Sequence, residues 1–211
     1  MSTPSTQAPA AERAIALIKD EHRALARVLG AMLALVSRYR DASEKRDFKL
    51  FDALLRYVEN VPDHLHHPKE DRVLFPALVR RTGENWKLID ELERDHARGE
   101  PLLAALRGAF QAFSYGTPNG LNQLATRVDE FAEFYWDHMR REEQQLLPLA
   151  LKYFTEEDWR QVESAFGDNA DPLFGAELAD EYRQLYGFIV ESVPASLKSY
   201  LESAAPRPAP K

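Results

Sequence analysis

Apolar residues recur at three- and four-residue steps in four long segments of the chain, over residues 11–39, 47–80, 86–113 and 121–154. This spacing puts the apolar side chains on one face of an α-helix. Short polar stretches separate the segments, with Gly83 after the second and "SYGTPNG" before the fourth. Because short loops make consecutive helices antiparallel neighbours, the pattern predicts an all-α fold, an up-down-up-down four-helix bundle.

Additional C-terminal helices are expected after the bundle. Thr155 opens "TEEDWRQVESAF" and is followed by acids, which is typical of a capped helix start. A weaker amphipathic pattern over residues 173–202 is broken by Pro194. We therefore expect a disordered N-terminus over 1–10, a bundle over 11–154, a helical extension over 155–202 that packs on the bundle or on a partner, and a disordered tail over 203–211.

The composition excludes several classes of protein. The chain has no cysteine, which rules out disulfides, thiolate zinc sites and iron–sulfur ligation by its own residues. The net charge is −7 without a basic stripe, so nucleic acid is not an expected partner. The N-terminus lacks the features of a secretory signal, and no apolar run approaches the ~18 residues of a membrane span. We expect a cytoplasmic protein.

Two of the four segments share a motif that carries candidate chemistry. "HHPKEDRVLFPAL" and "HMRREEQQLLPLA" align without gaps and both read His-x3-Glu-x5-Pro. In this register His66 pairs with His138, and Glu70 pairs with Glu142. Residues four apart lie on the same helix face, so each segment presents a histidine and a glutamate together.

The other two segments each supply one histidine, again in a repeated arrangement. Acids immediately precede both His22 and His96, and the spacing is 44 residues from His22 to His66 and 42 from His96 to His138. The first half of the chain thus resembles the second. The repeat predicts that every helix aims one histidine at a shared level of the bundle.

The stretch "DHLHHPKED" leaves a choice between neighbouring histidines. His66 is in phase with the fourth helix, whereas His67 lies roughly 100° further round a regular helix. Pro68 removes a backbone hydrogen bond, and a local bulge there would rotate His67 inward. His67 therefore stays the alternative ligand on this helix.

Imidazole nitrogens and carboxylate oxygens suit redox iron and, less selectively, manganese, cobalt or zinc. A lone histidine on an apolar stripe is more often a core residue than a ligand, and a single His-x3-Glu is usually a surface pair. The repeat of both features in both halves favours a buried metal site instead. The acids next to the histidines, Glu21, Asp95 and Asp137, are expected to point elsewhere, mostly into solvent.

The motifs "DEH", "HHPKE" with "LFP", "DHARGE" and "HMRREEQQLLP" resemble, in this order, those of the hemerythrin-like (HHE cation-binding) family, bacterial type. The resemblance covers roughly residues 11–154. It implies a four-helix bundle around two iron ions, oxo- or hydroxo-bridged, with manganese or zinc as substitutes. It assigns His22 and His66 to one iron, His96 and His138 to the other, and bridging roles to Glu70 and Glu142.

The third helix departs from the pattern of the oxygen-carrying hemerythrins. Those proteins hold two histidines four residues apart there, and this chain has Glu100 in the second place. Glu100 is therefore a further candidate metal ligand, and the exchange of a neutral ligand for an anion argues against simple reversible oxygen carriage.

The resemblance implies a non-haem di-iron protein that binds or reacts with oxygen, nitric oxide or peroxide in sensing, scavenging or a stress response. One alternative is an enzyme or iron donor of iron–sulfur centre repair, including nitric oxide reduction. Another is a metal-stabilised interaction module that contacts a protein partner or a second copy of the chain through residues 171–202.

Overall fold

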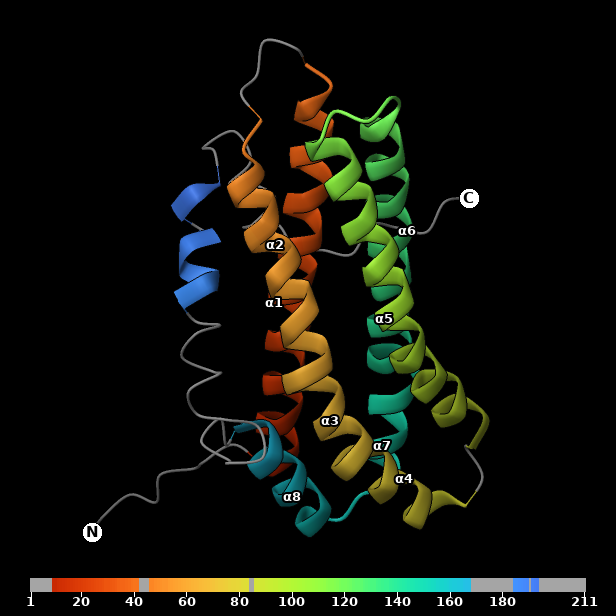
Figure 1. The fold of residues 1–211 in the computed structure, drawn as a ribbon. Helices are drawn as coiled ribbons and strands as arrows, with labels where there is room; N and C mark the ends of the chain where they lie inside the picture. Colours follow the sequence, from red (N-terminus) through yellow and green to blue (C-terminus); the bar gives the residue numbers. More distant parts are fainter. Residues whose placement is uncertain (1–8, 42–45, 84–85, 168–183, 190, 194–211) are drawn as a thin grey trace, which may run out of the picture.

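Four helical rods stand side by side and alternate in direction (Figure 1), which confirms the predicted all-α bundle. The computed structural model describes residues 9–41, 46–83, 86–167, 184–189 and 191–193. The first rod is α1 (Ala10–Tyr39) and the third is α5 (Trp86–Ser114). The second rod comprises α2 (Phe48–Asn60), η1 (Val61–His66), α3 (His67–Lys69), η2 (Glu70–Leu74) and α4 (Phe75–Thr82). The fourth comprises α6 (Gly120–Arg141), η3 (Glu142–Leu146) and α7 (Leu147–Tyr153).

The second rod begins and ends at residues suited to helix termini. The Asp47 side chain accepts a hydrogen bond of 2.9 Å from the backbone N–H of Leu50 and so caps the start. Gly83 ends the rod in the left-handed conformation, at φ 62°, and its N–H donates to the carbonyl of Val79. Glycine adopts this conformation without steric cost, which explains the stop that the sequence predicts.

Wide π-helical turns interrupt the second and fourth rods, where the sequence predicts regular helix. The segments η2 and η3 begin at Glu70 and Glu142, and Pro76 and Pro148 follow them at the second position of the next α-helix. A proline inside a helix lacks an N–H and clashes with the preceding turn. An extra residue per turn relieves this conflict, and such π-bulges are frequent at functional sites.

The core consists of two apolar clusters separated by a layer of histidines and glutamates. Ile18 of α1 belongs to one cluster and Leu25 to the other, with the buried His22 between them in sequence. Aromatic residues strengthen the larger cluster, where Phe51 stacks on Phe110 with ring centroids 4.6 Å apart. The polar layer thus has apolar packing above and below it along the bundle.

A further helix, α8 (Glu156–Gly167), packs across α1 and the second rod at one end of the bundle (Figure 1). Its start matches the predicted capping box, because the Asp158 carboxylate accepts a 2.8 Å hydrogen bond from the N–H of Thr155. The Arg13 guanidinium of α1 pairs with Glu163. Phe166, near the other end of α8, lies 5.6 Å from the ring of His66.

Helical residues 184–189 lie beside α2, in blue in Figure 1. Tyr186 contacts Tyr57 at 5.6 Å between ring centroids, and Ile189 is buried in the larger cluster. Residues 1–8 of the expected N-terminal segment 1–10, the expected tail 203–211 and most of 168–202 lie outside the described residues, and α1 begins at Ala10. Within the described part of the chain, no helix is both long enough and apolar enough to cross a membrane.

Replacement of Phe51 by alanine should lower the free energy of unfolding by about 3–5 kcal/mol, because it leaves a cavity in a fully packed cluster. Urea denaturation of the metal-free protein measures the loss. Lys49→Ala, at an exposed position of α2, is the control and should change stability by less than about 0.5 kcal/mol. Equal stability of the two variants would contradict the packing described.

Candidate metal centre

The polar layer brings together six of the seven residues that the sequence suggests as metal ligands. Their donor atoms form two overlapping groups, in each of which all atoms lie within 4.8 Å of one another. The first group comprises His22, His66, Glu70 and Glu142, and the second comprises Glu70, His96, His138 and Glu142. Both glutamates belong to both groups, as carboxylates that bridge two cations would.

Each glutamate directs one oxygen to each group. Oε1 of Glu70 lies 3.3 Å from Nε2 of His66, and Oε2 lies 3.3 Å from Nε2 of His96. The carboxylate of Glu142 lies 3.2 Å from Nε2 of His22 and 2.9 Å from Nε2 of His138. All four oxygens are buried, and none has a hydrogen-bond partner among the described residues. Such atoms require a bound cation or proton to offset their desolvation.

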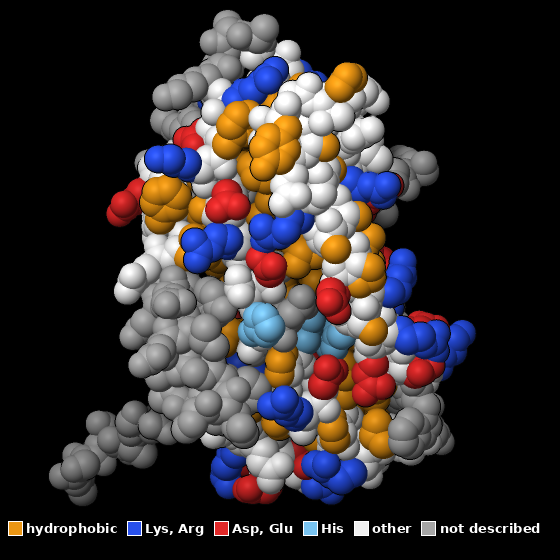
Figure 2. Space-filling model, viewed as in Figure 1, with side chains coloured by type: hydrophobic (Ala, Val, Ile, Leu, Met, Phe, Trp, Pro, Cys, Tyr) orange, Lys and Arg blue, Asp and Glu red, His pale blue; other side chains and the backbone are white. Residues whose placement is uncertain are grey.

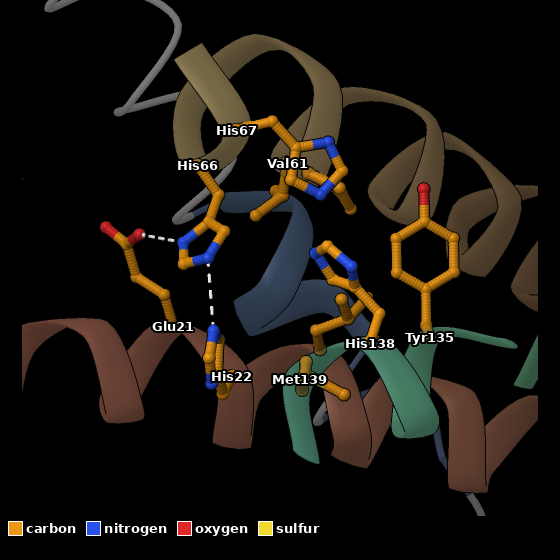
Figure 3. Close-up of a pocket in the computed structure, with 10 residues that line it drawn as sticks. Glu21, His22, Val61, His66, His67, Tyr135, His138 and Met139 are labelled. Carbon is orange, nitrogen blue, oxygen red and sulfur yellow. Dashed lines mark hydrogen bonds and ion pairs between the residues drawn. The ribbon is translucent and has the colours of Figure 1, made fainter. Parts of the chain in front are cut away.

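The orientation of the imidazoles points to the same requirement. His66 donates its Nδ1–H to Glu21 at 2.7 Å, and His22 donates its Nδ1–H to Glu143 at 2.9 Å. In the neutral rings this leaves Nε2 as the lone-pair nitrogen. The two Nε2 atoms face each other at 3.1 Å (Figure 3). Two lone pairs at this distance repel each other unless a cation or a proton lies between them.

A carboxylate from a neighbouring rod stands behind every one of the four histidines. His96 donates its Nδ1–H to Asp71 at 2.8 Å, and Nδ1 of His138 lies 3.6 Å from Asp95. The four carboxylates follow the order of the rods: α1 supplies Glu21 to the second rod, the second rod supplies Asp71 to α5, α5 supplies Asp95 to α6, and the fourth rod supplies Glu143 to α1. We call this arrangement the carboxylate ring.

The carboxylate ring corrects two expectations of the sequence analysis. Glu21 and Asp95 do not point into solvent, because each faces a histidine of the next rod. Asp137 alone of the three acids is exposed, and it pairs with Arg140 and Arg141. Sequence reasoning missed the ring, although the half-to-half repeat extends to it: Glu21 and Asp95 precede corresponding histidines, and Asp71 and Glu143 follow corresponding glutamates.

The repeat also includes a positively charged side chain beside each of Glu21 and Asp95. Lys69 precedes Glu70, and its ammonium contacts Glu21 at 2.9 Å. Arg141 occupies the corresponding place before Glu142 and pairs with Asp95. Lys69 is buried, with only 1% of its surface exposed. Both cations hold the carboxylates that orient the histidines, an arrangement known to tune the affinity of metal sites.

The charges of the layer shift the pKa values of its members in opposite directions. Burial and the charge of Glu142 act to raise the pKa of Glu70, but the positive charge and hydrogen bonding of His66 and His96 lower it to about 2. Burial opposes protonation of His138, but the charge of Glu142 and the facing Asp95 raise its pKa to about 10. Without a cation, the layer therefore keeps its carboxylates ionised and gathers protons on its histidines.

His67 is buried, as the bulge at Pro68 would require, and forms a third group with His96 and His138. Its ring stacks on that of His96 at 3.9 Å, and its donor nitrogen lies within 4.8 Å of those of His96 and His138. The π-turns on either side of it bring both neighbouring histidines into the interior. In the repeat, His67 corresponds to Met139, so two histidines of the second group have a third histidine beside them and the first group has no counterpart.

The structure does not bring Glu100 into either group. Its side chain is exposed one turn beyond His96, at the edge of an open pocket. Its role as a ligand stays a prediction.

A small cavity of about 10 Å³ borders histidines of both groups, and only one water-sized molecule would fit in it. Figure 3 shows His66, His67, His138, Tyr135 and Met139 around it. Its remaining walls are mostly apolar.

The fold and the layer together define a class, a four-helix bundle whose interior is built to hold metal cations. The donor set could hold metal, because its buried oxygen and nitrogen atoms converge in groups and the four carboxylate oxygens have no hydrogen-bond partner among the described residues. The family model of the hemerythrin HHE cation-binding domain matches residues 13–150. The chain therefore belongs to this family.

One curated relative is the F-box/LRR-repeat protein 5 of the mouse, which is 27% identical over 137 residues. The match covers 62% of this chain and 19% of the mouse protein, so the chain spans only a small part of that relative's length. No solved structure matches the chain significantly.

Replacement of Glu21 by glutamine should weaken binding of the cation in the first group by about tenfold or more. His66 would lose the charged acceptor that orients its ring. Asp95→Asn should do the same for the second group. Competition with a chromogenic chelator, resolved into two binding steps, measures both. Asp20→Asn, an exposed neighbour of Glu21 that pairs with Arg23, should change neither step. Equal weakening of both steps by Glu21→Gln would contradict the separate roles.

Cation binding should release protons and become tighter as the pH rises from 6 to 8. The pKa of His96 is about 9 and that of His138 about 10, so both rings are protonated at neutral pH in the metal-free protein and must lose a proton before they bind a metal. Each displaced proton makes the affinity rise by about tenfold per pH unit.

Calorimetry in two buffers with different ionisation enthalpies counts these protons. Chelator competition at several pH values, corrected for the titration of the chelator, measures the slope. An affinity that does not change with pH would contradict this account of the charges.

Proposed function

We propose that the chain is a non-haem di-iron protein that binds or reacts with a small ligand, namely oxygen, nitric oxide or peroxide. The observation that carries the proposal is the pair of donor groups joined by Glu70 and Glu142. Imidazole and carboxylate donors without thiolates suit iron in both of its common oxidation states. When bound, such a pair of irons supplies redox chemistry that no side chain of the protein provides.

The unequal surroundings of the two donor groups support reaction with an external ligand. Each group has two histidines and two carboxylates, but His96 and His138 of the second also group with His67. Open coordination positions are what distinguish reactive metal sites from structural ones. We infer that the first group leaves more room for a ligand, on the side of the small cavity.

The size and polarity of the cavity favour a small and weakly polar ligand. Its volume of about 10 Å³ admits a molecule of the size of water. Leu25, Val61 and Met139 contribute apolar walls, and Figure 3 shows Val61 and Met139 on either side of the histidines. A diatomic gas loses little hydration energy in such a cavity, whereas an ion or an organic substrate would lose more or would not fit.

Protein reconstituted with ferrous iron under argon should hold two irons per chain, one for each donor group. Admission of air, nitric oxide or peroxide should change its visible absorption spectrum. His66→Ala and Glu142→Ala should each lose at least one iron and lower the melting temperature, because bound metal stabilises the fold by mass action. His64→Ala, at an exposed position, is the control and should change neither the iron content nor the melting temperature.

A protein that binds two irons but whose spectrum does not respond to any of the three ligands would contradict the reactive role. The metal would then serve the fold or an interaction surface. Loss of iron in His64→Ala but not in His66→Ala would overturn the assignment of donors on the second rod.

A further inference from the structure

An open pocket of about 490 Å³ adjoins the second donor group, between the second rod and α5. On the corresponding face in Figure 2, histidine side chains reach the surface beside acidic ones. The pocket is lined by Glu59, His64, His67, Pro68, Asp71, His96, Ala97, Glu100 and Leu103. It is therefore far larger than the small cavity and mixed in polarity, and its chemistry suits a hydrated ion better than a gas.

The floor of the pocket is the second donor group itself. The side chain of His96 is only 8% exposed, and its Nε2 has no hydrogen-bond partner among the described residues. His67 stacks on it and is likewise buried. An ion that enters the pocket thus meets buried nitrogen donors directly.

Two side chains with metal-binding chemistry stand at the outer edge of the pocket. His64 precedes His67 by three residues, and Glu100 follows His96 by four, so both lie about one turn along their antiparallel rods from the donor group, toward the same end of the bundle. Both are exposed, and neither has an ion-pair partner among the described residues. The other acids at the edge are engaged, Asp71 with His96 and Glu59 with Arg107.

The helix α8 covers the first donor group from one side. Phe166 packs against His66 from outside, and the ammonium of Lys69 lies 5.1 Å from the centre of the Phe166 ring. The same ammonium neutralises Glu21. A cation approaching past Phe166 would meet the apolar inner face of α8 and the buried positive charge of Lys69, both of which oppose its passage.

We propose that the open pocket is the uptake route for divalent cations, and that His64 and Glu100 form a transient outer site on the way to the second donor group. The inference rests on the proposed metal centre but not on its reaction with gases. One imidazole and one carboxylate bind a hydrated cation weakly enough to release it inward. The unpaired charge of Glu100 also raises the local cation concentration, an effect that salt screens.

Stopped-flow binding of Co²⁺ to the metal-free protein tests the route, because the visible absorption of cobalt reports its coordination. The double variant His64→Ala/Glu100→Gln should bind cobalt about tenfold more slowly than the unsubstituted protein at low salt. Its final stoichiometry and final spectrum should be unchanged. Glu133→Gln, an exposed acid on α6 outside the pocket, is the matched control and should bind at the original rate.

A second pair of variants separates charge from obstruction. Ala97 is exposed and lines the same pocket, so Ala97→Lys and Ala97→Gln introduce side chains of similar reach that differ in charge. The lysine variant should bind cobalt more slowly than the glutamine variant, and the difference should shrink as salt is added.

Equal binding rates in all of these variants would overturn the route. Loss of one bound cobalt in Glu100→Gln would also overturn it, since Glu100 would then be a resident ligand. Failure of the unsubstituted protein to bind cobalt would instead overturn the metal centre, and the two failures are therefore distinguishable.

Discussion

Two fully buried carboxylates, Glu70 and Glu142, impose the constraint on which the rest of the structure depends. Two negative charges inside a bundle are tolerable only if positive charge surrounds them. A histidine Nε2 atom faces each of their four oxygens, and each of these four nitrogens comes from a different rod. The bundle therefore cannot assemble its polar layer from any subset of rods. Apolar packing above and below the layer excludes the water that would otherwise solvate these groups.

The carboxylate ring follows from helical geometry. Neighbouring residues in a helix point about 100° apart. When His22 faces the interior, Glu21 must face sideways, toward an adjacent rod, and there it meets His66. The same relation holds between His96 and Asp95. An acid next to a ligand histidine thus has a neighbouring rod within reach, and the orientation of each metal-binding ring depends on correct packing of two rods rather than one.

The sequence predicts the rods, their ends to within one or two residues, and the histidines and glutamates that converge, because these features depend on periodicity and on an internal repeat. The period of 3.6 residues assumes a uniform helix and does not predict the π-turns, so it puts His67 on the wrong face, and only the proline at position 68 suggests the bulge that turns His67 inward. Glu100 is the opposite case, because its spacing suggests a metal ligand and the structure places it outside both donor groups. Its spacing from His96 is that of the other ligand pairs, but the layer is only one turn thick and the residue falls outside it.

The two halves of the chain repeat each other in their ligands but differ in what surrounds them. His67 in one half corresponds to Met139 in the other, and the buried Lys69 corresponds to the partly exposed Arg141. One donor group therefore lies beneath α8, and the other lies beside an open pocket with His67 as a third histidine next to it. A symmetric carrier of two cations would need neither difference. The asymmetry is what a centre requires if cations arrive from one side and a small ligand is held on the other.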